Sequence, residues 1–137
     1  MAVLLDSGFL LASLNSSEAE HHATIRVLES IREPIVSAGA GNHRGCLPAS
    51  ARHRKRCAAD FISSLADTEL ILEAPLAEDY LRSAESLRQY ADADLDFVDA
   101  LIAATAERLN IKKLLTLDRR DFQLIRPRHC DGFELLP

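Results

Sequence analysis

The sequence predicts an α/β domain built on a mainly parallel β-sheet with helices on its faces. Short apolar runs typical of buried strands alternate along the chain with stretches in which apolar residues recur at helical spacing. Two of these runs end at an aspartate, Asp6 and Asp118, which places both carboxyl groups at the edge where α/β sheets bind ligands. The chain has 137 residues, enough for one hydrophobic core but not for two, so residues 1–137 are expected to form one domain.

The first part of the chain predicts two strands and two helices. Residues 1–5 are an apolar run typical of a buried strand, and Asp6 or Ser7 can cap the helix that follows. A second helix is expected to open at residues 17–20 and to stop before Pro34, and a short strand begins at Ile35-Val36. The apolar positions expected to face the core are Phe9, Leu10, Leu11 and Leu14 in the first helix and Ala23, Val27, Leu28 and Ile31 in the second.

The second part repeats the alternation of helix and strand. A helical pattern runs from Ala58 through Phe61, Ile62 and Leu65, and a strand is expected at residues 70–72. Pro75 precedes another expected helix, which bears the apolar residues Tyr80, Leu81, Ala84 and Leu87. The remaining elements are a polar loop over 92–96, a helix from about 97 to 109, a strand over 113–117 and a last strand over 133–136.

Composition is that of an ordinary globular protein. The hydrophobic fraction is 47%, the charged fraction is 27% and the net charge is −5. No apolar run approaches the roughly 20 residues that a membrane span needs, and the N-terminus lacks the basic stretch of a signal peptide. Three cysteines at irregular spacing do not suggest a disulfide framework. We therefore expect a cytoplasmic protein with no membrane partner.

Four aspartates stand where a predicted strand ends or a helix begins. Asp6 and Asp118 follow strands, whereas Asp96 and Asp99 lie three apart at a helix N-terminus and so share a face. Carboxylates that gather at the edge of a core raise each other's pKa unless a cation lies among them. This pattern predicts an acidic metal site. The alternative is that Asp6 and Asp96 only cap helices, and that residues 118–121 form a plain turn.

Three segments, residues 3–12, 92–100 and 115–122, resemble the acidic motifs of the PIN domain, and most of all the VapC-type toxins of bacterial toxin–antitoxin pairs. The closing segments 125–128 and 133–137 are similar to that group as well. The resemblance covers nearly the whole chain apart from residues 37–57. It implies a PIN-like domain with Mg²⁺- or Mn²⁺-dependent endoribonuclease activity.

The resemblance also implies which residues form the site. Asp6, Asp99 and Asp118 match the catalytic and metal-binding acids of the family, Asp96 is a further candidate metal ligand, and Asp121 is an accessory candidate. The implied partners are an RNA substrate, a small VapB-like antitoxin that inserts a segment near the site, and a second copy of the chain in a homodimer. The basic residues that could offset repulsion between this acidic chain and RNA are Arg119, Arg120, Arg126 and Arg128.

Two other functions compete with this interpretation. A phosphohydrolase with an aspartyl nucleophile would suit Asp6 after its strand, but Asp6-Ser7-Gly8 lacks the second acid two residues on that such chemistry uses. A catalytically impaired PIN-like binding module is the other alternative. It is favoured because the Glu that the family places near residue 44 is absent.

Residues 37–57 do not fit the rest of the chain. No acid occurs between Glu33 and Asp60, and five basic residues occur there: Arg44, Arg52, Arg54, Lys55 and Arg56. One hypothesis is that this stretch is read in a shifted frame, because moving the codons of residues 42–55 forward by one base permits an apolar helix headed by Glu. Other interpretations are a zinc site from His43, Cys46, His53 and Cys57, a phosphate-binding or targeting cluster at 52–56, or a solvated basic loop.

Two further groups of polar residues invite a metal-site interpretation. Glu18, His21 and His22 occur close together, but we expect them to form the solvated side of an amphipathic helix. His129 and Cys130 are expected to lie in a loop rather than to bind a metal.

Overall fold

The computed structural model describes residues 1–14, 17–38, 63 and 70–137. Within this part the chain forms a five-stranded sheet in the order β3-β2-β1-β4-β5, and each neighbouring pair of strands is parallel. The predicted α/β class with a parallel sheet is confirmed. The strands are β1 (Val3–Leu5), β2 (Ile35–Ala38), β3 (Ile71–Glu73), β4 (Lys113–Leu115) and β5 (Glu134–Leu136).

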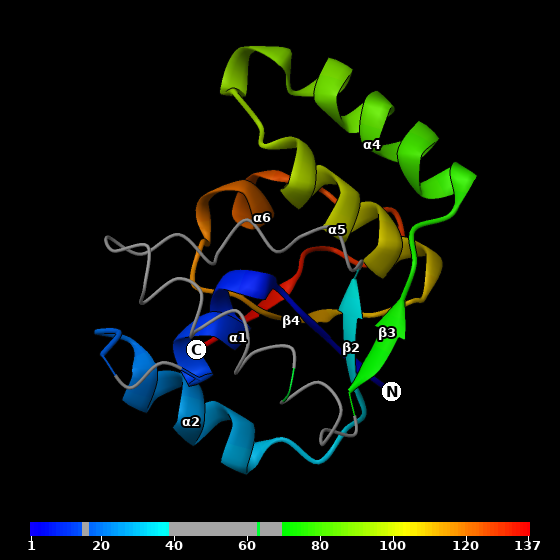
Figure 1. Ribbon diagram of the computed structural model, residues 1–137. Coiled ribbons are helices and arrows are strands. Elements are labelled where there is room, and N and C mark those ends of the chain that lie inside the picture. The colour runs from blue at the N-terminus through cyan, green and yellow to red at the C-terminus, as the bar shows by residue number, and fades with distance from the viewer. Residues whose placement is uncertain (15–16, 39–62, 64–69) are drawn as a thin grey trace.

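Helices cover both faces of the sheet (Figure 1). One face packs against α1 (Ser7–Leu14) and α2 (His21–Ser30), and the other packs against α5 (Phe97–Arg108) and α6 (Arg120–Leu124). The helix α4 (Ala77–Gln89) lies on α5, and a 3₁₀ turn, η2 (Ala91–Ala93), joins the two. The helical pattern expected from Ala58 onward lies outside the described residues, as do residues 39–57 of the anomalous segment.

The central strand β1 explains why the sequence begins with an unbroken apolar run. Leu4 packs against the α5 and α6 side, whereas Val3 and Leu5 pack against α1 and α2. All three side chains are at most 2% exposed. A strand covered on both faces must be apolar at every position.

The start of α2 differs from the prediction. Residues 17–20 form turns and the helix begins at His21, whose ring Nδ1 lies 2.8 Å from the carbonyl oxygen of Ala12 at the end of α1. The prediction that His21 belongs to a solvated face is therefore wrong, because its ring satisfies a carbonyl that α1 leaves without a helical partner. His22 is exposed, as expected.

The buried face of α4 is mostly polar. Tyr80 and Leu81 are 50% and 69% exposed, whereas the buried side chains are Asp79, Ser83 and Ser86, and Leu87 packs against a core cluster that includes Ala100 and Ala103 of α5. The reason is the surface of α5 against which α4 packs. That surface offers small residues and a charged end, so short polar side chains fit there while Tyr80 and Leu81 stay exposed.

Ion pairs join α5 to α4 and to β3. Arg108 Nε lies 3.0 Å from Asp79 Oδ1, and Arg108 Nη1 lies 3.0 Å from Glu73 Oε1. Arg82 binds both carboxylate oxygens of Glu107, at 2.8 and 3.0 Å. Since Asp79 is only 1% exposed, its charge depends on Arg108 for compensation.

Replacing Asp79 should destabilise the fold. The substitution Asp79→Ala leaves the partly buried Arg108 with one carboxylate fewer and removes the acceptor for the Leu76 N–H. We expect the free energy of unfolding to fall by about 3 kcal/mol in urea denaturation. The control is Glu78→Gln at the exposed neighbouring position, which should change it by less than about 0.5 kcal/mol. Equal effects of the two substitutions would contradict this assignment.

Candidate active site

The first part of the site is built by the two strands at the centre of the sheet. Leu5 of β1 pairs with Leu115 of β4, so the chain beyond each strand arrives at the same edge. Asp6 is the first residue after β1, and Asp118 follows β4 by three. Both therefore lie at the carboxyl edge of the sheet, as the sequence predicted.

Thr116 links these two acids. Its hydroxyl donates to Asp6 Oδ2 at 2.9 Å, and the Asp118 N–H donates to Thr116 Oγ at 3.1 Å. The side chain of Thr116 is buried. Thr116 was not among the predicted site residues, although a hydroxyl group inside the apolar run that precedes Asp118 is a signal by which it could be found.

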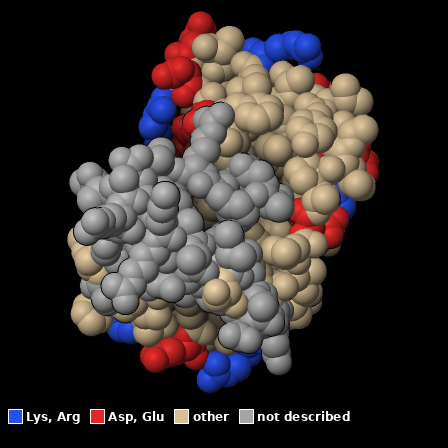
Figure 2. All heavy atoms as spheres, viewed as in Figure 1, with Lys and Arg blue, Asp and Glu red and all other residues tan. Residues whose placement is uncertain are grey.

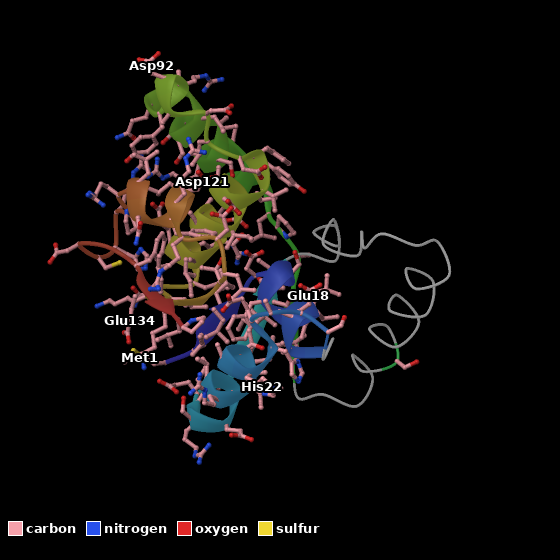
Figure 3. All side chains as sticks on the ribbon, turned by 90° about the vertical axis from the view of Figure 1, so that its left-hand side faces the viewer. Met1, Glu18, His22, Asp92, Asp121 and Glu134 are labelled. Carbon is pink, nitrogen blue, oxygen red and sulfur yellow. The ribbon has the colours of Figure 1, made fainter. Side chains whose placement is uncertain are left out.

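The helix α5 brings the third acid to the same place. Asp99 lies in the first turn of this helix and is 7% exposed. It is hydrogen-bonded to Asp121, which lies in the first turn of α6 and is buried as well. The Asp96 N–H donates to Asp121 Oδ2 at 3.0 Å, so Asp121 holds the beginning of α5 while it contacts Asp99. Figure 3 shows Asp121 inside the molecule.

Burial and crowding raise the pKa of Asp6 and Asp99 above the ordinary value of an aspartate. Burial raises the pKa of Asp6, and the negative charge of Asp118 adds to the effect, although hydrogen bonds from Thr116 and from the N–H groups of Ser7 and Gly8 oppose it. The pKa of Asp99 is raised to about 8, first by burial, then by the hydrogen bond with Asp121 and by the charges of Asp6, Asp121 and Asp118. Without a cation, Asp99 therefore keeps its proton at a pH at which an ordinary aspartate is ionised.

The half-buried Asp6, the buried Asp99 and the exposed Asp118 differ in their partners from the acids elsewhere in the described chain. Elsewhere Asp79, Glu107 and Glu33 are each paired with an arginine or a lysine. No described residue forms an ion pair with Asp6 or Asp99, or with Asp118, whose Oδ1 accepts the Arg120 N–H. Within the described chain, positive charge is therefore deficient at the point where negative charge is most concentrated.

The donor set fits a hard divalent cation. Such ions prefer carboxylate oxygens, and Asp121 Oδ1 is a buried oxygen for which no described residue supplies a hydrogen bond. Arg120 Nη1 lies 3.5 Å from that atom. As they stand, the described side chains contain no group of three or more acids, histidines or cysteines close enough to hold a metal ion. Position 44, where the family places a Glu, lies outside the described residues.

Asp96 is placed differently from the other predicted ligands. Its Oδ1 accepts the Val98 N–H at 2.8 Å, so its side chain caps α5. It is exposed, and its charge is not among those that act on Asp6 or Asp99. The structure thus groups Asp6, Asp99 and Asp118 with Asp121, and leaves Asp96 at the end of the helix.

The side chains of the four arginines predicted near the site bind different parts of the structure. Arg119 donates to the carbonyls of Pro137 and Leu135 beside β5, and Arg120 donates to the carbonyls of Ala93 and Asp94. Arg126 Nη1 donates to the Gln123 carbonyl.

Arg128 lies apart from the acidic site. Its guanidinium binds Glu85, and its N–H donates to Glu107 near the end of α5, about 12 Å along the helix from Asp99. There it lines a cavity of about 430 Å³ together with Arg82, Arg108 and His129. We place the candidate active site at the sheet edge rather than in this cavity. Three of the carboxylates that line the cavity are already paired with arginines.

The crowded acids should make the metal-free protein less stable as the pH rises. Between the ordinary pKa of 3.8 and about 8, folded Asp99 keeps a proton that the unfolded chain has lost, so the free energy of unfolding falls through this range. In EDTA, Asp99→Asn should be more stable than wild type at pH 8 by about 2 kcal/mol and should gain little at pH 5. Urea denaturation at both pH values measures this.

A matched control is Asp92→Asn, at an exposed acid far from the sheet (Figure 3). Its stability should follow that of wild type at both pH values. A wild-type stability that rises from pH 5 to pH 8 in EDTA, with no gain from Asp99→Asn, would show that the carboxyl groups do not repel one another.

Comparison with known proteins agrees with this geometry. The chain is 24% identical over 135 residues to ribonuclease VapC26 of Mycobacterium tuberculosis, a match that covers 98% of this chain and 100% of that protein. Its fold is similar to that of Mycobacterium tuberculosis VapC20, described as a sarcin–ricin loop cleaving toxin, with a TM-score of 0.71 and 20% identity over 82% of this chain and 86% of that one.

A second solved structure with this fold is VapBC2 from Rickettsia felis, bound to a DNA fragment from its promoter. The TM-score is 0.68 and the identity is 16%, over 98% of this chain and 97% of that one. The family model of the PIN domain matches residues 3–126, which include every acid of the site. The resemblance seen in the three acidic motifs is thereby confirmed, and the chain belongs to the PIN domain family.

Proposed function

We propose that this protein is a divalent-metal-dependent endoribonuclease and the toxin of a toxin–antitoxin pair. The observation that supports this most directly is the convergence of Asp6, Asp99 and Asp118 at the carboxyl edge of the sheet without cationic partners among the described side chains. The name of the relative VapC26, a ribonuclease, supports the same reaction class. The phosphohydrolase alternative has no such support.

Asp6, Asp99 and Asp118 are the proposed ligands of a Mg²⁺ or Mn²⁺ ion. When bound, such an ion lowers the pKa of a coordinated water and shields the negative charge of the phosphate under attack. Asp121 orients Asp99 through their hydrogen bond, and Thr116 orients Asp6. Asp96 would have to give up its hydrogen bond to the Val98 N–H to become a further ligand.

The protein's own residues make cation binding dependent on pH. Asp99 must release its proton before both of its oxygens can act as ligands, so the affinity for a cation should increase as the pH approaches 8. Among the described residues, no helix is long and apolar enough to cross a membrane. We propose that the protein acts on RNA in the cytoplasm.

The rival function is that of a catalytically impaired binding module, and the missing Glu near residue 44 favours it. We propose instead that residues 42–55 are read in a shifted frame, in which case the gene encodes the expected Glu. The coding DNA decides between these alternatives, because stop codons or polar residues in the other frame would exclude the shift.

RNA cleavage tests the proposed reaction. Wild type should cleave RNA with Mn²⁺ and should lose this activity in EDTA. The substitutions Asp118→Asn and Asp99→Asn should each lower the rate by about 100-fold or more, because each removes a charged ligand. Asp92→Asn, at the exposed acid far from the site, should cleave as wild type does. Cleavage that persists in EDTA would contradict the mechanism, and a wild type that neither cleaves RNA nor binds Mn²⁺ would favour the binding module.

The proposed protein partners are a small antitoxin and a second copy of this chain. The solved relative VapBC2 supports an antitoxin partner, since VapBC2 is a toxin–antitoxin complex. Large apolar side chains are exposed along α4, namely Leu76, Tyr80 and Leu81. Figure 2 shows few charged side chains over this part of the surface. We propose that α4 supplies part of the homodimer contact.

Light scattering after size-exclusion chromatography tests the dimer. Wild type should have twice the mass of one chain, and Leu81→Glu should shift it toward the monomer because a charge would be buried in an apolar contact. Glu85→Gln, on the same helix but at an exposed polar position, serves as the control. A wild-type monomer, or a dimer that Leu81→Glu leaves intact, would contradict this assignment.

A further inference from the structure

The loop that precedes α5 is fastened to α6 at two points. Arg120 of α6 donates to the carbonyls of Ala93 and Asp94, the latter at 3.5 Å, and Asp121 accepts the Asp96 N–H at 3.0 Å. Between these two attachments lies Leu95, which is 9% exposed and packs in a cluster with Ala100, Ala103 and Ile125. Two consecutive residues of α6 thus hold the backbone on both sides of a buried leucine.

This loop needs such attachments because its own backbone is irregular. The 3₁₀ turn η2 ends at Ala93, and Asp94 follows with φ of 53°, in the left-handed region that side chains with a Cβ disfavour. Carbonyl groups at the end of a short helix have no partner further along it and must find donors elsewhere. The planar guanidinium of Arg120 supplies donors to two consecutive carbonyls at once.

Arg120 also contacts the segment that contributes Asp118. Its backbone N–H donates to Asp118 Oδ1 at 3.3 Å, a bond that does not depend on the side chain, and its side-chain Nη1 lies 3.5 Å from Asp121 Oδ1. Arg120 therefore contacts Asp118 through its backbone. Its side chain contacts Asp121, which is hydrogen-bonded to Asp99, and the loop that leads into α5. The neighbouring Arg119 takes no part in this, since it donates to the carbonyls of Leu135 and Pro137.

We infer that Arg120 is a positioning residue, which holds the N-terminal turn of α5, and with it Asp99, against Asp118. This inference rests on the proposed function, because its purpose is to keep the acids close enough to share one cation. It assigns to Arg120 a role different from that of a surface charge for RNA. Its guanidinium is engaged by backbone carbonyls, although its side chain is 62% exposed.

The two roles predict opposite changes in metal affinity. If Arg120 were only a positive charge near the site, Arg120→Ala would remove repulsion toward a cation, and Mn²⁺ would bind equally well or more tightly. If Arg120 positions the loop, the same substitution lets α5 move away from Asp118 and Mn²⁺ binds more weakly. Groups that hold metal ligands in place typically contribute about 10- to 100-fold in affinity, and we expect about tenfold here.

The experiment combines Mn²⁺ titration calorimetry with amide hydrogen exchange of the metal-free protein. Arg120→Ala should weaken Mn²⁺ binding about tenfold and should accelerate exchange over residues 93–99. Arg120→Lys keeps the charge but cannot bind two carbonyls at once, so it should also weaken binding. The control is Arg126→Ala, which removes an exposed arginine that bonds only the Gln123 carbonyl through its side chain, and it should leave both measurements unchanged.

Unchanged or tighter Mn²⁺ binding by Arg120→Ala, with unchanged exchange over residues 93–99, would overturn the inference. A wild type that binds no Mn²⁺ would instead refute the proposed function. The exchange measurement would still decide whether Arg120 holds the loop, because it is made without metal.

Discussion

Repulsion among carboxyl groups crowded at the sheet edge is the constraint on which the organisation of this protein depends. Asp6, Asp99 and the neighbouring acids Asp118 and Asp121 come from three parts of the chain and meet at one edge of the sheet. Bringing them together raises the pKa of Asp6 and Asp99, and this costs stability at neutral pH. The arrangement persists because the strands, α5 and α6 are held by cores that do not involve these groups.

The groups that bind the Asp6 carboxyl directly are uncharged side-chain or backbone groups. Thr116 binds Asp6 through a hydroxyl, and the N–H groups of Ser7 and Gly8 bind the same carboxyl. An arginine or lysine bound to each carboxyl would have relieved the repulsion, but it would have occupied the place that a cation needs. Neutral donors orient the oxygens and leave the excess negative charge available, which is a common arrangement around metal ligands.

The other end of α5 has the opposite character. There Asp79, Glu107 and Glu73 are each bound to an arginine, and the network joins α4, α5 and β3. One helix therefore places an uncompensated acid in its first turn and compensated charges in its last. The first arrangement suits the binding of an ion, and the second fixes the position of α4 on the body of the domain. The relatives with known structure share this fold at only 20% and 16% sequence identity.

The amino-acid sequence by itself determined the parallel α/β class and the grouping of Asp6, Asp99 and Asp118. The spacing of apolar residues predicts the strands and helices, and the acids lie directly at the ends of these elements. The topology of a parallel sheet therefore predicts that the acids meet at one edge. The same local reasoning could not separate Asp96 from Asp121. Both are acids near helix N-termini, and only the packing of α6 on α5 turns one toward Asp99 and leaves the other as a cap.

The tertiary structure alone decided the face of α4 and the roles of Thr116 and Arg120. The sequence shows the apolar residues of α4, but which of them are buried depends on the partner surface, and α5 offers small residues and charges there, so Tyr80 and Leu81 stay exposed. Thr116 and Arg120 act through contacts with residues far away in the sequence, at Asp6 and at Ala93 and Asp94. The spacing of residues in the sequence predicts which side chains can share a face of a helix or strand. The packing of the whole chain determines which residues those side chains contact.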